Sequence, residues 1–268
     1  MNAKQQVHDF WNEASCGEDL YLKGETLRQK YFQQAKDRYA LEPYISGFAD
    51  FQSHADKQVL EIGVGLGADH QKFAEARASL HGCDLTERAI EHTRERLTLF
   101  SLSSDLRVAD AENLPYDTGS FDLVYSWGVI HHSPDTQRVV HEIFRVLKPG
   151  GQAKVMIYHK HSLVGYLLWL RYALAKGKPQ TSLTTIYANY LESPGTKAYS
   201  KPEAMQLFAQ FSQVTIQTVL THADLLASDA GQRHRSWLLA ISRRLYPRWL
   251  IKTFFPKHGL YMMISATK

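Results

Sequence analysis

The chain has 268 residues, of which 44% are apolar, so it can form one full-sized α/β domain. Lys and Arg number 31 and Asp and Glu 27, a mild excess that argues against nucleic-acid binding by charge alone. The two cysteines form no Cys-x-x-Cys pair, which argues against a disulfide framework and a structural zinc site and favours the cytoplasm. Neither a signal peptide nor an apolar stretch long enough to span a bilayer is evident.

Residues 1–58 carry no strand pattern and combine helix formers with aromatic residues, so we expect an N-terminal helical cap. Helical spacing predicts a helix over residues 27–41, and residues 10–17 are expected to form a turn before it. If the cap serves as a lid, Trp11 and Tyr21 are candidate substrate contacts. Core packing is the alternative for most of these aromatic side chains.

Residues 59–73, VLEIGVGLGADHQKF, carry the strongest signal in the chain. A short apolar run predicts a buried strand over residues 59–63, followed by a helix over about residues 68–77. Between them, Gly63, Gly65 and Gly67 would let the backbone approach a ligand closely and aim a helix N-terminus at it. Glu61 adds a carboxylate at the mouth of the strand. We therefore expect the floor of a nucleotide-type cofactor pocket.

Strand and helix patterns alternate over residues 59–160, which predicts a doubly wound, mostly parallel sheet. The further elements expected are strands at 80–83, 106–108, 121–126 and 153–158, helices at 87–99 with Thr86 as N-cap and at 135–146, and a turn at 147–151.

Two aspartates, Asp84 and Asp110, follow consecutive strands at the edge where such sheets bind ligands. One such carboxylate alone would be explained as a helix cap or a loop acid. Two of them downstream of a glycine loop favour nucleoside binding, with Asp84 on the ribose hydroxyls and Asp110 on the adenine amine.

Read as Gly63-x-Gly65-x-x-Ala68, the glycine loop fits a dinucleotide-binding fingerprint; read as Gly63-x-Gly65-x-Gly67, it fits a different family. The surrounding motifs decide between the two. These motifs are DAENLPY at 110–116, GSFDLV at 119–124 and LKPGG at 147–151. Together with the glycine loop they resemble class I S-adenosylmethionine-dependent methyltransferases, most closely the group that includes ubiquinone and menaquinone-biosynthesis enzymes. The resemblance covers about residues 55–160. It implies a seven-stranded Rossmann-like sheet whose last strand, 259–267, runs antiparallel beside a strand at 214–219.

The resemblance also implies S-adenosylmethionine as cofactor and methyl transfer to a small-molecule acceptor through an O, S, N or C nucleophile. The cofactor-binding residues that it implies are Glu61, Gly63, Gly65, Gly67, Asp84, Leu85, Asp110, Ala111, Ser126, Trp127 and Gly128. Methyl transfer from a sulfonium requires mainly alignment of the two reactants. A general base is needed only when the nucleophile arrives protonated.

His131 and His132 follow the fourth strand at the expected active-site edge, so they are candidate catalytic bases. The alternative is that they cap the next helix or pack beneath the cofactor. A metal site built from these two residues with His159 and His161 lacks a supporting spacing, and we expect none.

Residues 159–205 are expected to form a lid insertion within a core of residues 59–268. It would contain an apolar helix over 162–175 and a helix over 202–211 capped by Ser200. The apolar helix is consistent with core packing, a pocket lining, a dimer contact or a membrane contact. Tyr158, Thr196 and Tyr199 are candidate substrate contacts.

Residues 230–268 contain no Asp or Glu, and their basic residues alternate with aromatic ones. This mix suits an anionic substrate, an acidic membrane surface or RNA, although a solvated basic edge is the ordinary explanation. RNA methylation is disfavoured because residues 126–129 read SWGV, where amino-group methyltransferases of nucleic acids carry an Asn-Pro-Pro-Tyr-type motif. The prediction is methylation of a small molecule. Its alternatives are a lipophilic quinone-type acceptor at a membrane surface and a non-catalytic module that binds S-adenosylmethionine; oligomeric state does not follow from the sequence.

Overall fold

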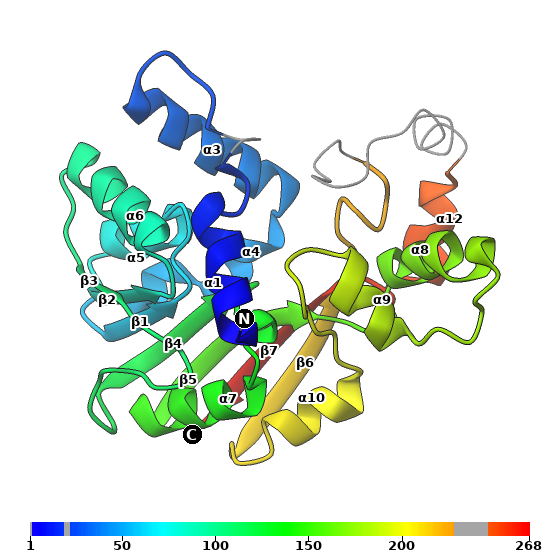
Figure 1. Ribbon diagram of the computed structural model, residues 1–268. Helices are drawn as coiled ribbons and strands as arrows, with labels where there is room; N and C mark the ends of the chain where they lie inside the picture. Colours follow the sequence, from blue (N-terminus) through cyan, green and yellow to red (C-terminus); the bar gives the residue numbers. More distant parts are fainter. Residues whose placement is uncertain (1, 19–21, 228–245) are drawn as a thin grey trace.

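The structure is a computed structural model that describes residues 2–18, 22–227 and 246–268 (Figure 1). Its centre is a seven-stranded sheet in the order β3-β2-β1-β4-β5-β7-β6, in which β7 is antiparallel to both neighbours. The strands are β1 (Gln58–Ile62), β2 (Ser79–Asp84), β3 (Asp105–Val108), β4 (Phe121–Trp127), β5 (Leu147–Tyr158), β6 (Gln213–Val219) and β7 (Tyr261–Thr267). The predicted fold class is confirmed, including the antiparallel last strand.

Helices flank the sheet and cover one end of it (Figure 1). The α-helices are α1 (Ala3–Glu13), α3 (Leu27–Leu41), α4 (Tyr44–Ala49), α5 (Ala68–Glu75), α6 (Glu87–Leu99), α7 (Thr136–Val146), α8 (Leu163–Tyr172), α9 (Leu183–Tyr190), α10 (Lys201–Leu207) and α12 (Arg248–Phe254). Short 3₁₀ turns are η1 (Phe51–His54), η2 (Ile130–His132) and η3 (Leu174–Lys176).

Period-two alternation along the strands divides the core into two layers. One layer joins Leu60 and Val124 to apolar residues of α7 and α10. The other layer joins Val59 and Tyr125 to α4, η1 and α5. Because successive strand residues point to opposite faces, both faces of the central strands are buried, as a parallel sheet requires.

Local capping signals locate the helix starts as predicted. The Thr86 side chain accepts a hydrogen bond from the backbone N–H of Ala89 at the start of α6. Ser200 and Glu203 form a capping box at α10, where each side chain bonds the other's backbone. The helix predicted over residues 27–41 is confirmed with those bounds.

Three local predictions are wrong. Residues 10–17 do not form a single turn, because α1 runs through Phe10 and Trp11 from an Asn2 cap. The turn expected at 147–151 lies inside β5, where a register shift against β4 accommodates it. The polar stretch after Pro179 forms α9, which was not expected and which Ser182 caps.

The segment between β5 and β6 lies at one end of the sheet, where Figure 1 shows α8, α9 and α12 away from α3 and α6. Asp224 ties this segment to the sheet, because its buried carboxylate accepts hydrogen bonds from the backbone of Val164, Thr221 and Leu260. Tyr187 adds a second tie by donating a hydrogen bond to the carbonyl of His159 at 2.9 Å. None of the described helices has both the length and the apolar character that crossing a bilayer requires.

Candidate active site at the carboxyl edge of the sheet

A cavity of about 790 Å³ opens where the first strands end, a size typical of small-molecule sites. One side is formed by the glycine loop and the ends of β2 and β3, the other by α8 and residues 221–226, with α1 alongside. The lining includes these residues singled out from the sequence: Trp11, Glu61, Gly63, Gly65, Gly67, Asp84, Leu85, Asp110, Ala111, Trp127, Gly128, His132 and Tyr158.

All three glycines of the loop after β1 have positive φ, which side chains other than glycine rarely adopt. A Cβ at Gly63 would lie 2.1 Å from Val129, and one at Gly67 would lie 2.9 Å from the Thr93 hydroxyl. A Cβ at Gly65 would meet nothing within 4 Å, because this residue faces the cavity. Gly63 and Gly67 therefore permit close packing, whereas Gly65 leaves space for a ligand beside the backbone.

The carboxylate of Asp84 is fixed at the cavity wall by its own loop. It accepts hydrogen bonds from the backbone and hydroxyl of Thr86 at 3.0 and 2.8 Å and from the Gly65 N–H at 3.3 Å. Burial raises the pKa of Asp84, although these hydrogen bonds oppose the shift. The side chain is thus pre-oriented to accept hydrogen bonds from a ligand.

Glu61 is buried beside the glycine loop and pairs with His70, whose Nδ1 lies 2.8 Å from its carboxylate. Burial and the nearby Asp69 carboxylate raise the pKa of Glu61 well above its usual range, and burial lowers the pKa of His70 to about 3. The pair therefore carries little net charge, and a cation in the cavity would favour the ionised carboxylate of Glu61.

A polar network that the sequence did not reveal continues the cavity wall beside Glu61, and its central pair, Arg38 and Asp69, lines the cavity. Arg38 of α3 donates two hydrogen bonds to the Asp69 carboxylate, at 3.1 and 2.7 Å, and the hydroxyls of Tyr39 and Tyr125 each donate one at 2.9 Å. Burial acts to raise the pKa of Asp69, but Arg38 and the two hydroxyls outweigh it and lower the pKa. The network holds α3 and β4 against the start of α5.

Arg96 is fully buried on α6 and bonds only to neutral acceptors. Its guanidinium donates to the side chains of Gln71 and Gln34 and to the carbonyls of Leu66 and Tyr31, over 2.6 to 3.0 Å. Leu66 belongs to the glycine loop, so this one cation joins the cap helix α3, the loop and α6.

Helix α1 lies along the cavity and contributes Lys4, Val7, Phe10 and Trp11 to its lining. The Lys4 ammonium lies 2.5 Å from the Asp110 carboxylate and 2.6 Å from that of Glu112. Asp110 is therefore paired with the N-terminal helix in this structure. Sequence spacing alone gave no signal of that contact, because the partners are 106 positions apart.

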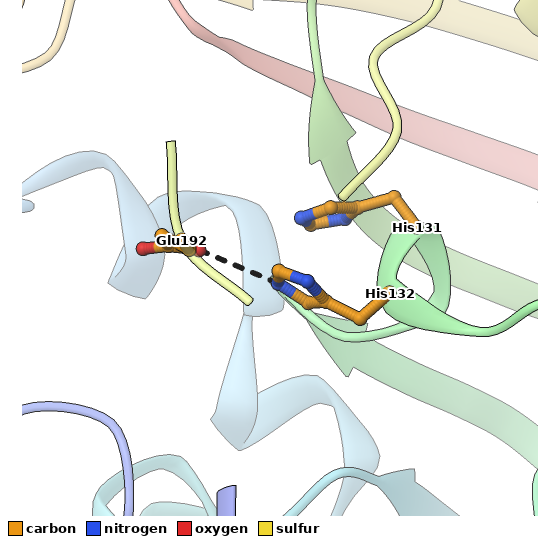
Figure 2. A group of neighbouring side chains, drawn as sticks. All are labelled: His131, His132 and Glu192. Carbon is orange, nitrogen blue, oxygen red and sulfur yellow. Dashed lines mark ion pairs between the residues drawn. The ribbon is translucent and has the colours of Figure 1, made fainter. Parts of the chain in front are cut away.

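His131, His132 and Glu192 form a cluster (Figure 2), of which His132 and Glu192 line the cavity. Both histidines come from η2, and Glu192 comes from the segment after α9 (Figure 2). The Nε2 atom of His132 lies 3.4 Å from the Glu192 carboxylate, which also accepts a hydrogen bond from the Tyr158 hydroxyl at 2.7 Å. The Nδ1 atom of His132 lies 2.8 Å from the Ser193 hydroxyl and 3.1 Å from that of Thr196.

The two histidines differ in their surroundings. His132 lines the cavity, whereas His131 is fully buried and packs on the Tyr158 ring at 4.1 Å. Neither ring nitrogen of His131 has a hydrogen-bond partner among the described residues, and burial lowers its pKa well below the usual range. One ligand atom from each of His131, His132 and Glu192 lies within 4.8 Å of the others, a combination that suits a divalent transition metal. The absence of a metal stays a prediction.

Other residues singled out from the sequence lie outside the cavity lining. Ser126 is buried and donates a hydrogen bond to the Ile62 carbonyl at 3.0 Å. Thr196 is buried and reaches the cavity only through His132. Tyr199 packs against the layer that contains α7. Tyr21 lies outside the described residues.

The residues at this edge fit an adenosyl cofactor with a cationic sulfonium. Gly65 leaves room beside the backbone, Asp84 offers a fixed carboxylate and Glu61 offers a buried one whose ionisation a cation would favour. Carboxylates at the ends of adjacent parallel strands match the hydroxyls and amine of a nucleoside.

A known protein family matches the part of the chain that carries strands β1 to β5. Residues 60–155 match a family described as a methyltransferase domain. This part of the chain is therefore similar to methyltransferase domains, and the site residues described above fit S-adenosylmethionine as the cofactor.

Curated relatives resemble the same region. The chain is 31% identical over 157 residues to 27-O-demethylrifamycin SV methyltransferase of Amycolatopsis mediterranei, covering 53% of this chain and 56% of that one. It is 35% identical over 121 residues to phosphoethanolamine N-methyltransferase 2 of Caenorhabditis elegans, covering 43% and 26%. The chain thus spans only about a quarter to a half of the length of these relatives.

Solved structures share the fold over nearly the whole chain. The geranyl diphosphate C-methyltransferase of Streptomyces coelicolor superposes with a TM-score of 0.63 at 13% identity, covering 100% of this chain and 98% of that one. A [4+2]-cyclase superposes with a TM-score of 0.56 at 16% identity, covering 88% and 82%. Because one fold serves such different named activities, the likeness establishes architecture alone.

Proposed function

We propose that this chain, whose residues 60–155 match a methyltransferase domain family, transfers a methyl group from S-adenosylmethionine to a small lipophilic acceptor. One observation carries the proposal: a single cavity is lined by the glycine loop, by Asp84 and by His132. The relatives differ in the acceptors that their names give, so the acceptor class is argued from the cavity itself.

The cofactor supplies an electrophilic methyl group on its sulfonium, and the chain would bind and orient it. Asp84 would accept hydrogen bonds from the ribose hydroxyls, with Leu85 against the adenine. Ala111 would offer its backbone to the adenine, and Asp110 its carboxylate after exchanging Lys4 for the amine. Trp127 and Gly128 line the cavity beyond the glycine loop and would face the sulfonium end. Ser126 would support this end of the site indirectly, through the hydrogen bond that its hydroxyl donates to the Ile62 carbonyl of β1.

His132 is the base that the contacts favour for an acceptor with an O–H group. The Thr196 hydroxyl already donates to the Ser193 carbonyl at 2.7 Å, so at Nδ1 of His132 it can only accept. We therefore place the proton on Nδ1, where the Ser193 hydroxyl at 2.8 Å can also accept it, so that the lone pair of Nε2 can take up a proton. A proton taken up at Nε2 would be stabilised by the Glu192 carboxylate 3.4 Å away.

His131 then has a positioning role, because it lies beneath His132 and packs against Tyr158, out of contact with the cavity. Tyr158 holds Glu192 through its hydroxyl and presents its ring to the cavity. Tyr158 and Trp11, whose ring centroids lie 6.2 and 5.3 Å from that of His132, would contact the acceptor.

The acceptor side of the cavity is apolar, which favours a lipophilic molecule. Its lining includes Val164, Leu167, Leu168, Leu191, Leu226 and Leu260. An apolar molecule with an acidic hydroxyl, such as a quinone precursor or a phenol, matches this lining and the adjacent base. A quinone-type or phenolic acceptor agrees with the resemblance of the sequence motifs to quinone-biosynthesis methyltransferases.

A binding assay tests the cofactor half of the proposal. Calorimetry with S-adenosylhomocysteine should show binding, and calorimetry with NADP should show none. Asp84→Asn should weaken binding about 30-fold, because it weakens charge-assisted hydrogen bonds of about 2 kcal/mol. Asp105→Asn, at the opposite end of the neighbouring strand, should leave affinity unchanged. Binding of NADP in place of S-adenosylhomocysteine would overturn the assignment.

Turnover separates an enzyme from a non-catalytic module that binds the cofactor. A panel of phenols, quinols, alcohols, thiols and amines is incubated with S-adenosylmethionine, and release of S-adenosylhomocysteine is measured. For an O–H acceptor, His132→Gln should lower kcat about 10²- to 10⁴-fold without changing S-adenosylhomocysteine affinity. His141→Gln, exposed on α7, is the matched control. Tight cofactor binding without turnover of any acceptor favours the non-catalytic module, and undiminished kcat in His132→Gln rejects the base.

A further inference from the structure

Helix α8 is apolar on two sides at once. Its inner side, with Val164, Leu167 and Leu168, lines the cavity. Its outer side, spaced by four residues, exposes Tyr166 and Leu170 and continues into exposed Leu174. A helix that is apolar all round is normally buried all round, so among the described residues the outer side lacks the cover that its composition calls for.

Helix α12 has the same property. Ile251 is buried, but Trp249 and Phe254 are 69% and 66% exposed, and Phe255 follows them, also exposed. The N–H of Leu163, which starts α8, donates a hydrogen bond to the carbonyl of His258 just after α12. Figure 1 shows α8 and α12 at the same end of the molecule.

Exposed apolar side chains are concentrated at this end. Of the ten large ones exposed in the described part of the chain, seven belong to residues 159–191 or 246–268. We define the α8–α12 face as Tyr166, Leu170, Leu174, Trp249, Phe254 and Phe255, with the exposed cations Arg171, Lys176, Lys178, Lys252 and Lys257. A cluster of this kind marks an interaction surface more often than ordinary solvent exposure does.

The charge around the face decides its occupant. Residues 159–191 and 246–268 contain no Asp or Glu, so the charged side chains of the two segments that carry the face are all basic. A second copy of the face would bring like charges together and is disfavoured. Anionic lipid headgroups complement the cations, while the apolar side chains can enter the headgroup boundary.

We propose that the α8–α12 face docks the protein on an anionic membrane surface. The proposal deepens the proposed function, on which its consequence for the acceptor rests: α8 would separate the bilayer from the cavity, and a lipophilic acceptor would reach His132 past its inner side. Membrane docking itself depends only on the α8–α12 face and does not require the proposed function.

Vesicle flotation tests the proposal on the full chain. Binding is compared for vesicles of phosphatidylcholine alone and for an equimolar mixture with phosphatidylglycerol, at low and high salt. The expected result is binding to the anionic vesicles that weakens with salt and is absent on neutral vesicles.

Two double variants remove the two parts of the face. Trp249→Ser with Phe254→Ser and, separately, Lys252→Glu with Lys257→Glu should each weaken vesicle binding about tenfold or more. Phe32→Ser with Lys36→Glu makes matched changes on α3, where Phe32 is 63% exposed, and should leave binding unchanged. The charge variant keeps the proposal testable if the aromatic variant fails to fold.

S-adenosylhomocysteine binding by each variant in solution separates this proposal from the proposed function. Vesicle binding without S-adenosylhomocysteine binding would support the face and reject the cofactor assignment. Absence of vesicle binding, equal binding to neutral and anionic vesicles, or an equal loss in the α3 control would overturn the proposal. A concentration-dependent dimer that the Trp249 and Phe254 changes abolish would also overturn it, because the face would then cover a second copy.

Discussion

The two sides of the cavity are held by different kinds of interaction. The cofactor side rests on buried charges and hydrogen bonds, among them Arg38 with Asp69, and Arg96 with four neutral acceptors. The acceptor side consists mostly of leucines on α8 and the following loops, tied to the sheet by Asp224 and Tyr187.

This difference follows from what each side would bind. A fixed, charged cofactor requires polar groups in one exact arrangement, and a buried polar network specifies such an arrangement. An apolar acceptor is selected by the shape of its surroundings, which leucines provide with few directional contacts. The family match over residues 60–155 ends before α8, consistent with a shared cofactor side and an individual acceptor side.

The largest expected effect is on the cofactor side. Arg96→Leu would leave two glutamine oxygens and two carbonyls without their donor, and each unpaired buried acceptor costs about 1–3 kcal/mol. We expect the free energy of unfolding to fall by about 4 kcal/mol, measured by urea denaturation. The exposed Arg94→Leu on the same helix should change it by less than about 0.5 kcal/mol. A small loss in Arg96→Leu would mean that the network does not hold this side.

The second effect is a pH dependence confined to the cofactor side. Because burial raises the pKa of Glu61 and a cationic ligand favours its ionised form, binding releases a proton. S-adenosylmethionine affinity should therefore rise by up to about tenfold per pH unit below that pKa and level off above it. Calorimetry in two buffers of different ionisation enthalpy measures the proton release. Glu61→Gln should reduce it, and an unchanged release would assign the proton to another group.

A smaller effect is expected on the acceptor side. Tyr187→Phe removes a buried hydroxyl that lies 2.7 Å from Ser162 and 2.9 Å from the His159 carbonyl. We expect a loss of about 1 kcal/mol and faster amide exchange in α8, without a change in S-adenosylhomocysteine affinity. Tyr116→Phe is the control, since that buried hydroxyl has no hydrogen-bond partner among the described residues. A changed affinity in Tyr187→Phe would show that the two sides are coupled.

The smallest effect concerns the contact of α1 with the cofactor side. With the cofactor bound, Asp110 would face the adenine amine, so Lys4→Met removes from that state the ion pair with Glu112, which is partly exposed and worth about 1 kcal/mol or less. We expect S-adenosylhomocysteine to dissociate about two- to fivefold faster, because α1 then opens more readily. Stopped-flow fluorescence of Trp11, in the cavity lining, provides the measurement, with the exposed Lys23→Met as control. Unchanged dissociation would mean that α1 does not limit exchange.

The sequence signals located the features that depend on residues close together in the chain. The glycine loop, the two strand-terminal aspartates and the Thr86 cap follow from spacing within one element and its turn. The contacts that complete the site are distant in sequence: Glu192 reaches His132 across 60 positions and Lys4 reaches Asp110 across 106. Such pairings depend on how elements pack, which residue spacing does not report. The helical pattern of α1 was missed because its aromatic residues also suit a turn.

The position of β7 has a consequence for how the protein is made. β7 follows β6 in the sequence, yet it pairs between β5 and β6, so β6 has no partner in the described sheet until β7 is in place. β1 to β5 pair without it, so the cofactor side can form while the ribosome is still synthesising the rest. The Asp224 carboxylate accepts a hydrogen bond from the Leu260 N–H, and the Leu163 N–H at the start of α8 donates one to the His258 carbonyl, both next to β7. The acceptor side can therefore mature only after β7 has been synthesised, and a nascent chain would form its cofactor pocket before its acceptor pocket.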